Sequence, residues 1–321
     1  MLRLFAALAM CTVLAAAPGA EAQDNSPAKT VRLVVSFPPG GGVDAVARLF
    51  ADKMSAILGQ TVVVENRGGA SGTIAEKQVA AAEPDGATVL VASNSMLVAQ
   101  AMNPNVGLDI ERDLYAVASV APQAVIVVVA PDLPTATLSD LIELARTRKL
   151  NYGSPGAGSV PHLVLEYLFT STAPARMEHI PYPGAAQALT GVLSKQIEVA
   201  VVTLPPAVSL VAAGKLKGIA VTTAARAAAL PQVPTTTEAG YPSVMVTVWN
   251  GFFVPAKTPK PIRDRLSDTV LKVAAMPDIA QKLAQLGFEP TGIAGERFQR
   301  DVAAEIKTWA AVVEKAGLRA R

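Results

Sequence analysis

The sequence has almost no cysteine and very little histidine. Among its 321 residues there is one cysteine, Cys11, and there are two histidines, His162 and His179. A single cysteine forms no internal disulfide, and zinc sites need several convergent Cys or His ligands. The two histidines do not form a His-x-x-x-His pair. We therefore predict no metal ion, no other cofactor and no thiol chemistry.

Charged and aromatic residues are also scarce. Charged residues make up 17% of the chain and aromatic residues 5%, and the formal net charge is +2 at pH 7. Nucleic-acid-binding proteins concentrate lysine and arginine on one face and often stack bases on aromatic rings. The composition therefore argues against a nucleic-acid partner. Hydrophobic residues reach 51%, so the chain can bury the core of one large or two ordinary domains.

The N-terminal stretch has the pattern of an export signal. Arg3 precedes an apolar run at 4–17, and residues 20–22 (Ala-Glu-Ala) follow the small-x-small rule of a cleavage site. The run is shorter than the roughly 20 residues that a membrane-spanning helix needs. We therefore predict a signal peptide at 1–22, a mature chain that begins near Gln23, and a periplasmic location.

Short valine-rich runs alternate with segments of helical spacing through the rest of the chain. The runs predicted as buried strands are VRLVVSF, TVVVEN, TVLVAS, AVIVVVAP, IEVAVVT, KGIAVTT and VMVTVWNGFFVP. The segments with apolar residues every three or four positions are 45–58, 138–146, 186–193, 262–274 and 295–316. This alternation is typical of an α/β fold with mainly parallel sheets covered by helices.

Two of the strand-like runs are candidates for crossings between lobes. They lie near residues 127 and 250. If they pair, the chain builds one lobe, crosses, builds the second and returns. We predict that lobe one comprises 23–124 plus 248–321 and that lobe two comprises 125–247. A small molecule would then bind in the cleft between them.

Glycine- or serine-rich loops precede four of the predicted helices. They are SFPPGGGVDAVARLF, NRGGASGTIAEKQVA, ASNSMLVAQAM and NYGSPGAGSVPHLVLEYL. A helix N-terminus presents unpaired N–H groups and a partial positive charge, and glycine lets a ligand approach them. None of the loops fits the spacing of a dinucleotide-binding or P-loop motif. One such loop is commonly a plain βα connection, but opposed loops from two lobes form a clamp for an anion.

Several side chains in these loops admit more than one interpretation. Asp44 either holds the first turn through backbone hydrogen bonds, which we prefer, or meets an amine on the ligand. Ser154 and His162 leave open a Ser–His–acid hydrolase, although GSPG is not a G-x-S-x-G nucleophile elbow. We prefer a His162 that orients its loop or binds ligand. Trp249 and Tyr182 suit either the core or the wall of the cleft.

The order and spacing of these motifs resemble the extracytoplasmic solute receptors of tripartite tricarboxylate transporters, often called Bug receptors. The matching stretches run through the mature chain: FPPGGGVDAVAR, VVVENRGGASGTIAEKQVAAAEPDGATVLVAS, LNYGSPGAGSVPHLVLE, IPYPGAAQALTGVLSKQIEVAVVTLPPAVSLVAAGKLKGIAVTT, LPQVPTTTEAGYP and APAKTPKPIRDRL. Each motif alone is weak, whereas their shared order is specific.

The resemblance implies a type II, two-lobed Venus-flytrap binding protein without catalytic activity. It implies a small organic carboxylate as ligand, a large and a small membrane permease subunit as partners, and a monomer. The ligand-binding residues that we expect are Phe37, Gly41, Gly42, Asp44, Ser71, Gly72, Ser93, Asn94, Ser154, Gly158, Ser159, His162, Tyr182, Thr203 and Trp249.

The sequence departs from the family pattern at three places. Val202 stands where an aspartate is usual, Pro183 stands where a lysine often follows the tyrosine, and the loop SNSMLVAQ differs from the expected Thr- and His-containing one. We expect these changes to make the cleft less charged, and hence the ligand to be a carboxylate with an apolar or aromatic body. A periplasmic sensor for a two-component system remains an alternative to transport.

Overall fold

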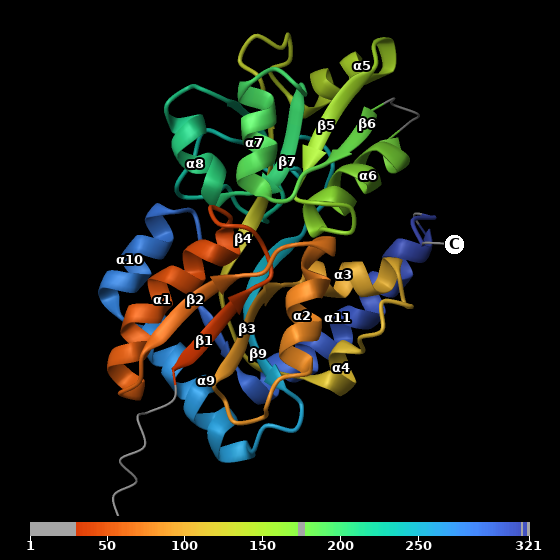
Figure 1. Ribbon diagram of the computed structural model, residues 1–321. Helices are drawn as coiled ribbons and strands as arrows, with labels where there is room; N and C mark the ends of the chain where they lie inside the picture. The colour runs from red at the N-terminus through yellow and green to blue at the C-terminus, as the bar shows by residue number, and fades with distance from the viewer. Residues whose placement is uncertain (1–29, 173–176, 316, 320–321) are drawn as a thin grey trace, which may run out of the picture.

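The computed structural model describes residues 30–172, 177–315 and 317–319. The predicted signal peptide, residues 1–22, lies outside the described residues. The described chain forms two lobes, each with a sheet that helices cover on both faces (Figure 1). The predicted α/β, two-lobed architecture is therefore the one observed, but both sheets combine parallel and antiparallel pairs where mainly parallel sheets were expected.

The sheet of lobe one has the strand order β2–β1–β3–β9–β4, with β10 beside β4. Its strands are β1 (Val31–Val35), β2 (Val62–Asn66), β3 (Thr88–Ser93), β4 (Leu114–Val129), β9 (Thr247–Pro255) and β10 (Gly292–Ala294). The pairs β1–β2 and β1–β3 are parallel, whereas β9 and β4 run antiparallel to their neighbours. β3 is buried along its whole length, which explains its unbroken apolar run.

The sheet of lobe two continues from the same long strand in the order β4–β7–β5–β6, with β8 also beside β4. Its other strands are β5 (Leu150–Ser154), β6 (Met177–Pro181), β7 (Val199–Thr203) and β8 (Lys217–Val221). The pairs β5–β6 and β5–β7 are parallel. The sequence reasoning missed β5, β6 and β10, because polar residues or glycine interrupt all three.

Two strands carry the chain between the lobes, and they pair with each other antiparallel. The register of that pair shifts between Val120 and Gln123, where Ala121 has a left-handed φ of 49°. The Asn250 side chain of β9 donates a 2.7 Å hydrogen bond to the Ala121 carbonyl. Gln123 donates in turn to Asn250 Oδ1, at 3.3 Å. The bend between the lobes is therefore held by buried amide side chains.

Helices cover both faces of the first sheet. One face carries α1 (Gly42–Leu58), α9 (Lys260–Ala274) and α10 (Pro277–Gln285); the other carries η1 (Ala70–Gly72), α2 (Thr73–Ala80), α3 (Ser95–Met102), α4 (Ile110–Asp113) and α11 (Gly295–Lys315). In α1 the buried residues Val46, Phe50 and Met54 recur at helical spacing. The helix ends at Leu58, and the next residue, Gly59, forms its left-handed cap with a φ of 66°.

Lobe two carries α5 (Leu138–Thr147) and α6 (Val160–Thr172) on one face of its sheet, and α7 (Ala185–Leu193) and α8 (Pro205–Ala212) on the other. The last turns of α11 also reach this lobe, because Val313 is buried in its core. The lobe limits of 23–124 plus 248–321 and 125–247 therefore remain a proposal, since α11 contacts both lobes. Among the described helices, none has the length and apolar character needed to cross a membrane.

Candidate ligand-binding cleft

The first glycine loop joins β1 to α1 and is held rigid by Asp44. This buried carboxylate accepts a 3.0 Å hydrogen bond from the Gly40 amide, others from Arg48 Nε at 3.0 Å, and one from Asn66 at 2.9 Å. Burial by itself raises the pKa of Asp44, but these hydrogen bonds outweigh it and hold the pKa below its usual 3.8. Gly41, the residue before α1, has no side chain to cap the helix. The loop therefore presents bare backbone.

The second loop lies between β2 and α2 and has an unusual backbone. Ala70 and Ser71 have φ values of 48° and 54°, which non-glycine residues adopt only at some cost. This conformation directs the Ser71 hydroxyl to the Ala157 carbonyl of lobe two, to which it donates a hydrogen bond. The loop is thus one of the direct links between the lobes.

A buried carboxyl group lies directly behind this second loop. Glu76 in α2 is 2% exposed, and its Oε1 has no hydrogen-bond partner among the described residues. A Cβ on Gly72 would lie 2.7 Å from that oxygen. Burial raises the pKa of Glu76 to about 8, so the group is mostly protonated at pH 7. No negative charge therefore stands behind the loop at neutral pH.

The third loop meets the first turn of α6. Ser95 Oγ, at the start of α3, accepts a 3.1 Å hydrogen bond from the Val160 amide of lobe two. Ser159 caps α6, because its hydroxyl accepts from the His162 amide at 3.3 Å and donates to the Gly156 carbonyl at 2.8 Å. The N-termini of α3 and α6 consequently face each other across the junction of the lobes.

Two histidines support the lobe-two loop from behind. Ser154 Oγ lies 2.7 Å from His179 Nε2, and the Gly158 amide donates to His162 Nδ1 at 3.3 Å. The imidazole rings are 4.1 Å apart, and burial lowers the pKa of each to about 4, so both are neutral at pH 7. Ser154 is thus paired with His179, not with the His162 of the hydrolase alternative, and it is fully buried. The Ser154 hydroxyl also donates to the Gly156 carbonyl at 3.1 Å, so it supports the loop.

An inner cavity of about 30 Å³ lies where these loops meet. Its walls are Phe37, Pro38, Gly41, Gly42, Val43, Ser93, Ser95, Pro155, Ser159, Pro161, Ala185 and Thr203. The N-terminal ends of α1, α3, α6 and α7 all contribute, and none of the described residues that line it is charged. Four partial positive charges therefore converge on a space that holds a water molecule or two.

A larger groove of about 820 Å³ opens outside the inner cavity. The two spaces share Phe37 and Pro155. The groove runs between the second loop and the 155–158 loop, and Tyr182 and Pro183 form part of its lobe-two wall. Lys77 is the one charged residue among the described residues that line it.

Comparison with known proteins identifies the family. The model of the "Tripartite tricarboxylate transporter family receptor" matches residues 46–318. The chain belongs to this receptor family. A "UPF0065 protein in tcbD-tcbE intergenic region" from Pseudomonas sp. strain P51 is 33% identical over 98% of this chain and 93% of its own.

Solved structures agree with this membership. An R. palustris protein solved with adipate is 34% identical and has a TM-score of 0.86, over 91% of this chain and 99% of its own. MatC from Rhodopseudomonas palustris, solved with bound malate, is 30% identical with a TM-score of 0.82, over 89% and 99% of the two chains. The type II binding-protein class that the motifs implied is confirmed.

The receptor brings most of the predicted site residues to the junction between its lobes. The predicted residues that line the inner cavity are Phe37, Gly41, Gly42, Ser93, Ser159 and Thr203. The predicted residues that line the outer groove are Phe37, Ser71, Gly158 and Tyr182. Asp44, Gly72, Ser154 and His162 line neither space and lie behind the loops that do.

Two predicted residues lie on the opposite side of the junction. Trp249 packs edge-on against Phe298, with ring centroids 4.9 Å apart, and its indole donates to Glu305. Asn94 donates to the Thr247 carbonyl at 3.0 Å. Val202, expected to make the cleft wall apolar, is instead fully buried in the core of lobe two, because side chains alternate along β7 and Thr203 faces the cavity.

The sequence reasoning missed residues that the receptor places at the cleft. Gln123 lies against Gly42, since a Cβ on that glycine would come within 3.0 Å of both Oε1 and Nε2. Gln123 and Asn250 were detectable as single polar residues inside otherwise apolar strands. Ser95 lies in the third loop and Lys77 follows the second, but the sequence pattern did not distinguish either of them from its neighbours as a cleft residue. Among the described residues, no cluster of potential metal ligands occurs.

Proposed function

We propose that this receptor captures a small carboxylate between its lobes and delivers it to the membrane permease of a tripartite tricarboxylate-type transporter. The observation that carries the proposal is the convergence of four helix N-termini on a cavity without charged walls. Helix N-termini attract anions through free N–H groups and the helix dipole. At α6 only the dipole contributes, because the Val160 and His162 amides already donate to Ser95 and Ser159 and Pro161 has no N–H. Held by amides alone, the anion is bound without a permanent counter-ion, which suits capture followed by release.

The walls of the inner cavity favour a ligand with an apolar body. Four of the lining residues are Pro38, Pro155, Pro161 and Ala185, and the Phe37 ring completes that side. Adipate and malate, bound by the two R. palustris relatives, are both dicarboxylates. We propose that one carboxylate lies at the helix N-termini, while a second, where present, extends along the groove toward Lys77.

Binding requires the lobes to move. The inner cavity of about 30 Å³ is far too small for an organic acid, and the Ser71–Ala157 and Ser95–Val160 hydrogen bonds close the lobes over it. An open conformer must admit the ligand, which then favours closure through its contacts with both lobes. Small-angle scattering should show compaction with a tight ligand; no compaction with any tight ligand would contradict the mechanism.

A thermal-melting series tests the ligand class. We expect adipate and acids with an aromatic body, such as phenylacetate, to raise the melting temperature in proportion to the logarithm of their concentration. Citrate and glutamate serve as controls, because their additional charged groups meet uncharged walls. A stabilising shift from citrate or amino acids alone would overturn the proposal. Native mass spectrometry of freshly purified protein offers an independent readout, as a co-purifying acid adds its own mass.

Delivery needs a cellular test. Cells that express the full chain, including residues 1–22, with the large and small permease subunits of a relative should accumulate labelled adipate. The control chain lacks residues 1–22, which we expect to abolish export and uptake together. Uptake that is unchanged without the receptor would contradict a transport role. A dependence of a two-component response on the ligand would favour the sensor alternative.

A further inference from the structure

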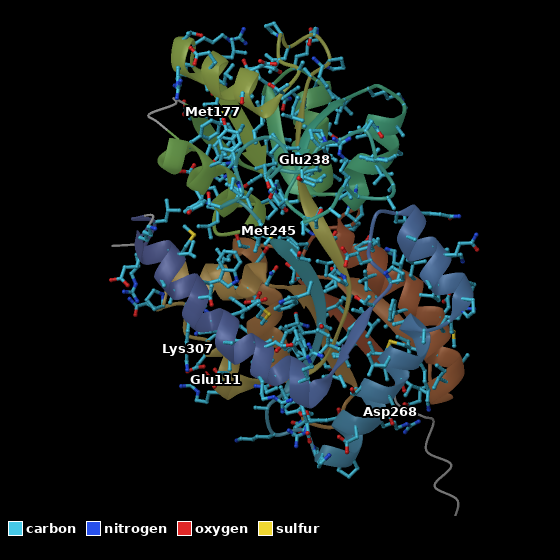
Figure 2. The ribbon with its side chains drawn as sticks, turned by 180° about the vertical axis from the view of Figure 1, so that it is seen from behind. Glu111, Met177, Glu238, Met245, Asp268 and Lys307 are labelled. Atoms are coloured by element: carbon cyan, nitrogen blue, oxygen red, sulfur yellow. The ribbon has the colours of Figure 1, made fainter. Side chains whose placement is uncertain are left out.

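A second pocket lies on the reverse side of the molecule, behind the strands that join the lobes. Figure 2 shows α11 running across this side, with Met245 at the waist between the lobes. The pocket has a volume of about 480 Å³ and is formed by α6 of lobe two, the connecting segment 243–247, the second half of α11, and Asn94. It shares no lining residue with the inner cavity or the groove.

One end of this hinge-side pocket carries the carboxyl group of Glu305. Glu305 accepts a 3.0 Å hydrogen bond from the Trp249 indole, and the side chains of Trp309 and Asn94 lie near enough to lower its pKa, although burial outweighs them. Among the described residues, no lysine, arginine or histidine forms an ion pair with Glu305. A partly buried carboxylate that has only neutral donors lacks the compensation that a cation supplies.

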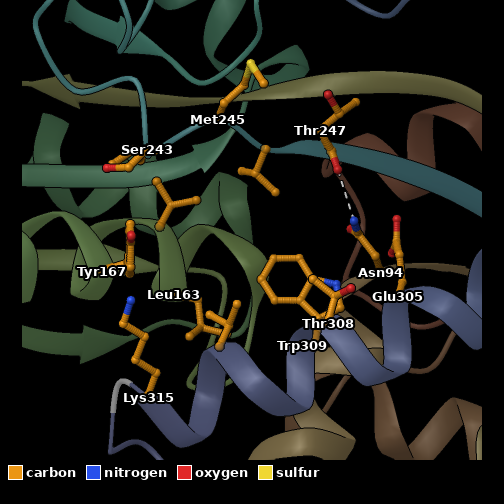
Figure 3. A pocket seen from close by; sticks show the side chains of 14 residues that line it. Asn94, Leu163, Tyr167, Ser243, Met245, Thr247, Glu305, Thr308, Trp309 and Lys315 are labelled. Carbon is orange, nitrogen blue, oxygen red and sulfur yellow. Dashed lines mark hydrogen bonds between the residues drawn. The ribbon is translucent and has the colours of Figure 1, made fainter.

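The buried amide oxygen of Asn94 lies on the same wall. Asn94 is 1% exposed, and its Nδ2 donates to the Thr247 carbonyl (Figure 3). Its Oδ1 has no hydrogen-bond partner among the residues that the structure describes. The inner end of the pocket therefore carries two acceptor groups, Glu305 and Asn94, and the potential at that end is negative. Lys315, the one cation among the described residues that line the pocket, lies in the last turn of α11, about 15 Å along the helix from Glu305.

The other walls of the hinge-side pocket are mainly apolar and partly aromatic. Trp309 projects from α11 beside Glu305, and Tyr167 lines the opposite end (Figure 3). Leu163, Val164 and Val312 fill the space between them. Aromatic faces attract organic cations, and this attraction grows as the cation is removed from water.

We propose that this pocket binds an organic cation, namely an ammonium group attached to an apolar or aromatic body. The ammonium group would lie against the Glu305 carboxylate and the Trp309 ring, and the body would occupy the apolar walls. The proposal does not rest on the function of the cleft, because the two sites have no residue in common. An occupant would touch α6 of lobe two and α11 at once, and so would bridge the hinge.

The two tryptophans of the chain supply the readout, because the Trp249 indole donates to Glu305 and Trp309 lines the pocket. The probe is 2-phenylethylamine, and the control is 2-phenylethanol, which has the same body without the charge. We expect the amine to shift both indole N–H resonances saturably in the full mature chain. The alcohol should bind at least 10-fold more weakly. Saturating adipate should not displace the amine.

Two variants test whether the amine binds at Glu305 in this pocket, and a third serves as the control. Glu305→Gln keeps the hydrogen-bond acceptor but removes the charge, and we expect it to weaken amine binding at least 10-fold. Thr308→Arg, on the exposed side of α11, places a cation in the pocket and should abolish binding without disturbing the core. Lys307→Ala, an exposed neighbour that does not line the pocket, should bind the amine as the native chain does. Equal affinities for amine and alcohol, unchanged binding in Glu305→Gln, or displacement by adipate would each overturn the proposal.

Discussion

The two sides of the junction between the lobes differ in how they acquire their electrostatic character. The cleft side is lined by helix N-termini and small uncharged residues, so its positive potential comes from the backbone. The hinge side has aromatic walls, the Glu305 carboxyl at one end and Lys315 in the last turn of α11, so the negative potential at the Glu305 end comes from a side chain. Truncating one side chain cannot remove an electrostatic potential that arises from backbone N–H groups, whereas it can remove one that arises from a single carboxylate. Substitutions that act on one side should therefore leave the other side unchanged.

The largest effect is expected from Gly42→Ala on the cleft side. The new Cβ would come within 3.0 Å of the Gln123 side chain, so α1 or the hinge amide must move. We expect the affinity for adipate to fall roughly 100-fold, about 2.7 kcal/mol. Isothermal titration calorimetry measures this fall, and 2-phenylethylamine binding serves as the control that should not change. A matching loss at both sites would instead indicate general misfolding.

The next effect concerns the pH dependence of stability through Glu76. Its pKa is raised to about 8 in the folded chain from 4.5, so the folded state binds more protons between these values. Stability is therefore fully present below pH 4.5 and falls as pH rises to about 8. Glu76→Gln should remove this slope and raise the free energy of unfolding at pH 7 by about 1–3 kcal/mol. Urea denaturation between pH 5 and pH 9 checks it.

The matched control for this prediction is Glu83→Gln, which removes an exposed carboxylate from the same lobe. It should leave the pH dependence of the free energy of unfolding in place.

Ionisation of Glu76 should also affect the cleft side, because it would put a negative charge behind the second loop. Adipate affinity should consequently fall above pH 8 in the native chain and not in Glu76→Gln. An equal slope in all three proteins would show that Glu76 is not the group responsible.

A smaller effect is expected from Gly41→Ala. A Cβ at this position has no atom within 4 Å, and the φ of −90° is open to any residue, so the fold should be kept. The methyl group would occupy part of the inner cavity. We expect about a 10-fold loss of adipate affinity, near 1.4 kcal/mol, with an unchanged melting temperature for the unliganded protein. Unchanged affinity would mean that the carboxylate binds elsewhere in the groove.

The smallest expected effect is the pH dependence of amine binding in the hinge-side pocket. Burial raises the pKa of Glu305, so acid converts this carboxyl to its neutral form sooner than an exposed glutamate. Affinity for 2-phenylethylamine should therefore decline as the solution is made acidic, and the Glu305→Gln affinity should stay flat. Indole N–H titrations at several pH values give the comparison. A decline of equal size in the variant would assign the effect to another group.

The fold was largely predictable because the local patterns agree with it. All seven valine-rich runs lie within or overlap strands, and the five segments of helical spacing coincide with helices. The strands β5 and β6 were missed, since Asn151, Gly153 and His179 break the apolar pattern there. Those residues are tolerated because neighbouring strands and the Ser154–His179 hydrogen bond satisfy their polar groups.

The candidate site was only partly predictable, because proximity in sequence does not reveal side-chain direction. The glycine loops could be assigned to the cleft from their position at helix starts. That Ser154 and His162 lie behind the loop, and that Trp249 faces the hinge, depends on which side of a strand or helix each occupies. Gln123 lies against Gly42, which is 81 positions earlier in the chain, and local sequence patterns do not reveal a contact over that separation.

By itself the sequence determined the alternation of strands and helices, the glycine loops before the helices and the scarcity of charge. These follow from local propensities and from residue composition. Only the tertiary structure decided that four helix N-termini converge on one uncharged cavity, and that Glu305, Trp309 and Asn94 meet behind the hinge. Both arrangements bring together segments that lie far apart in the chain. Their chemistry arises from the packing of two lobes, because the distance between groups sets the strength of electrostatic interactions.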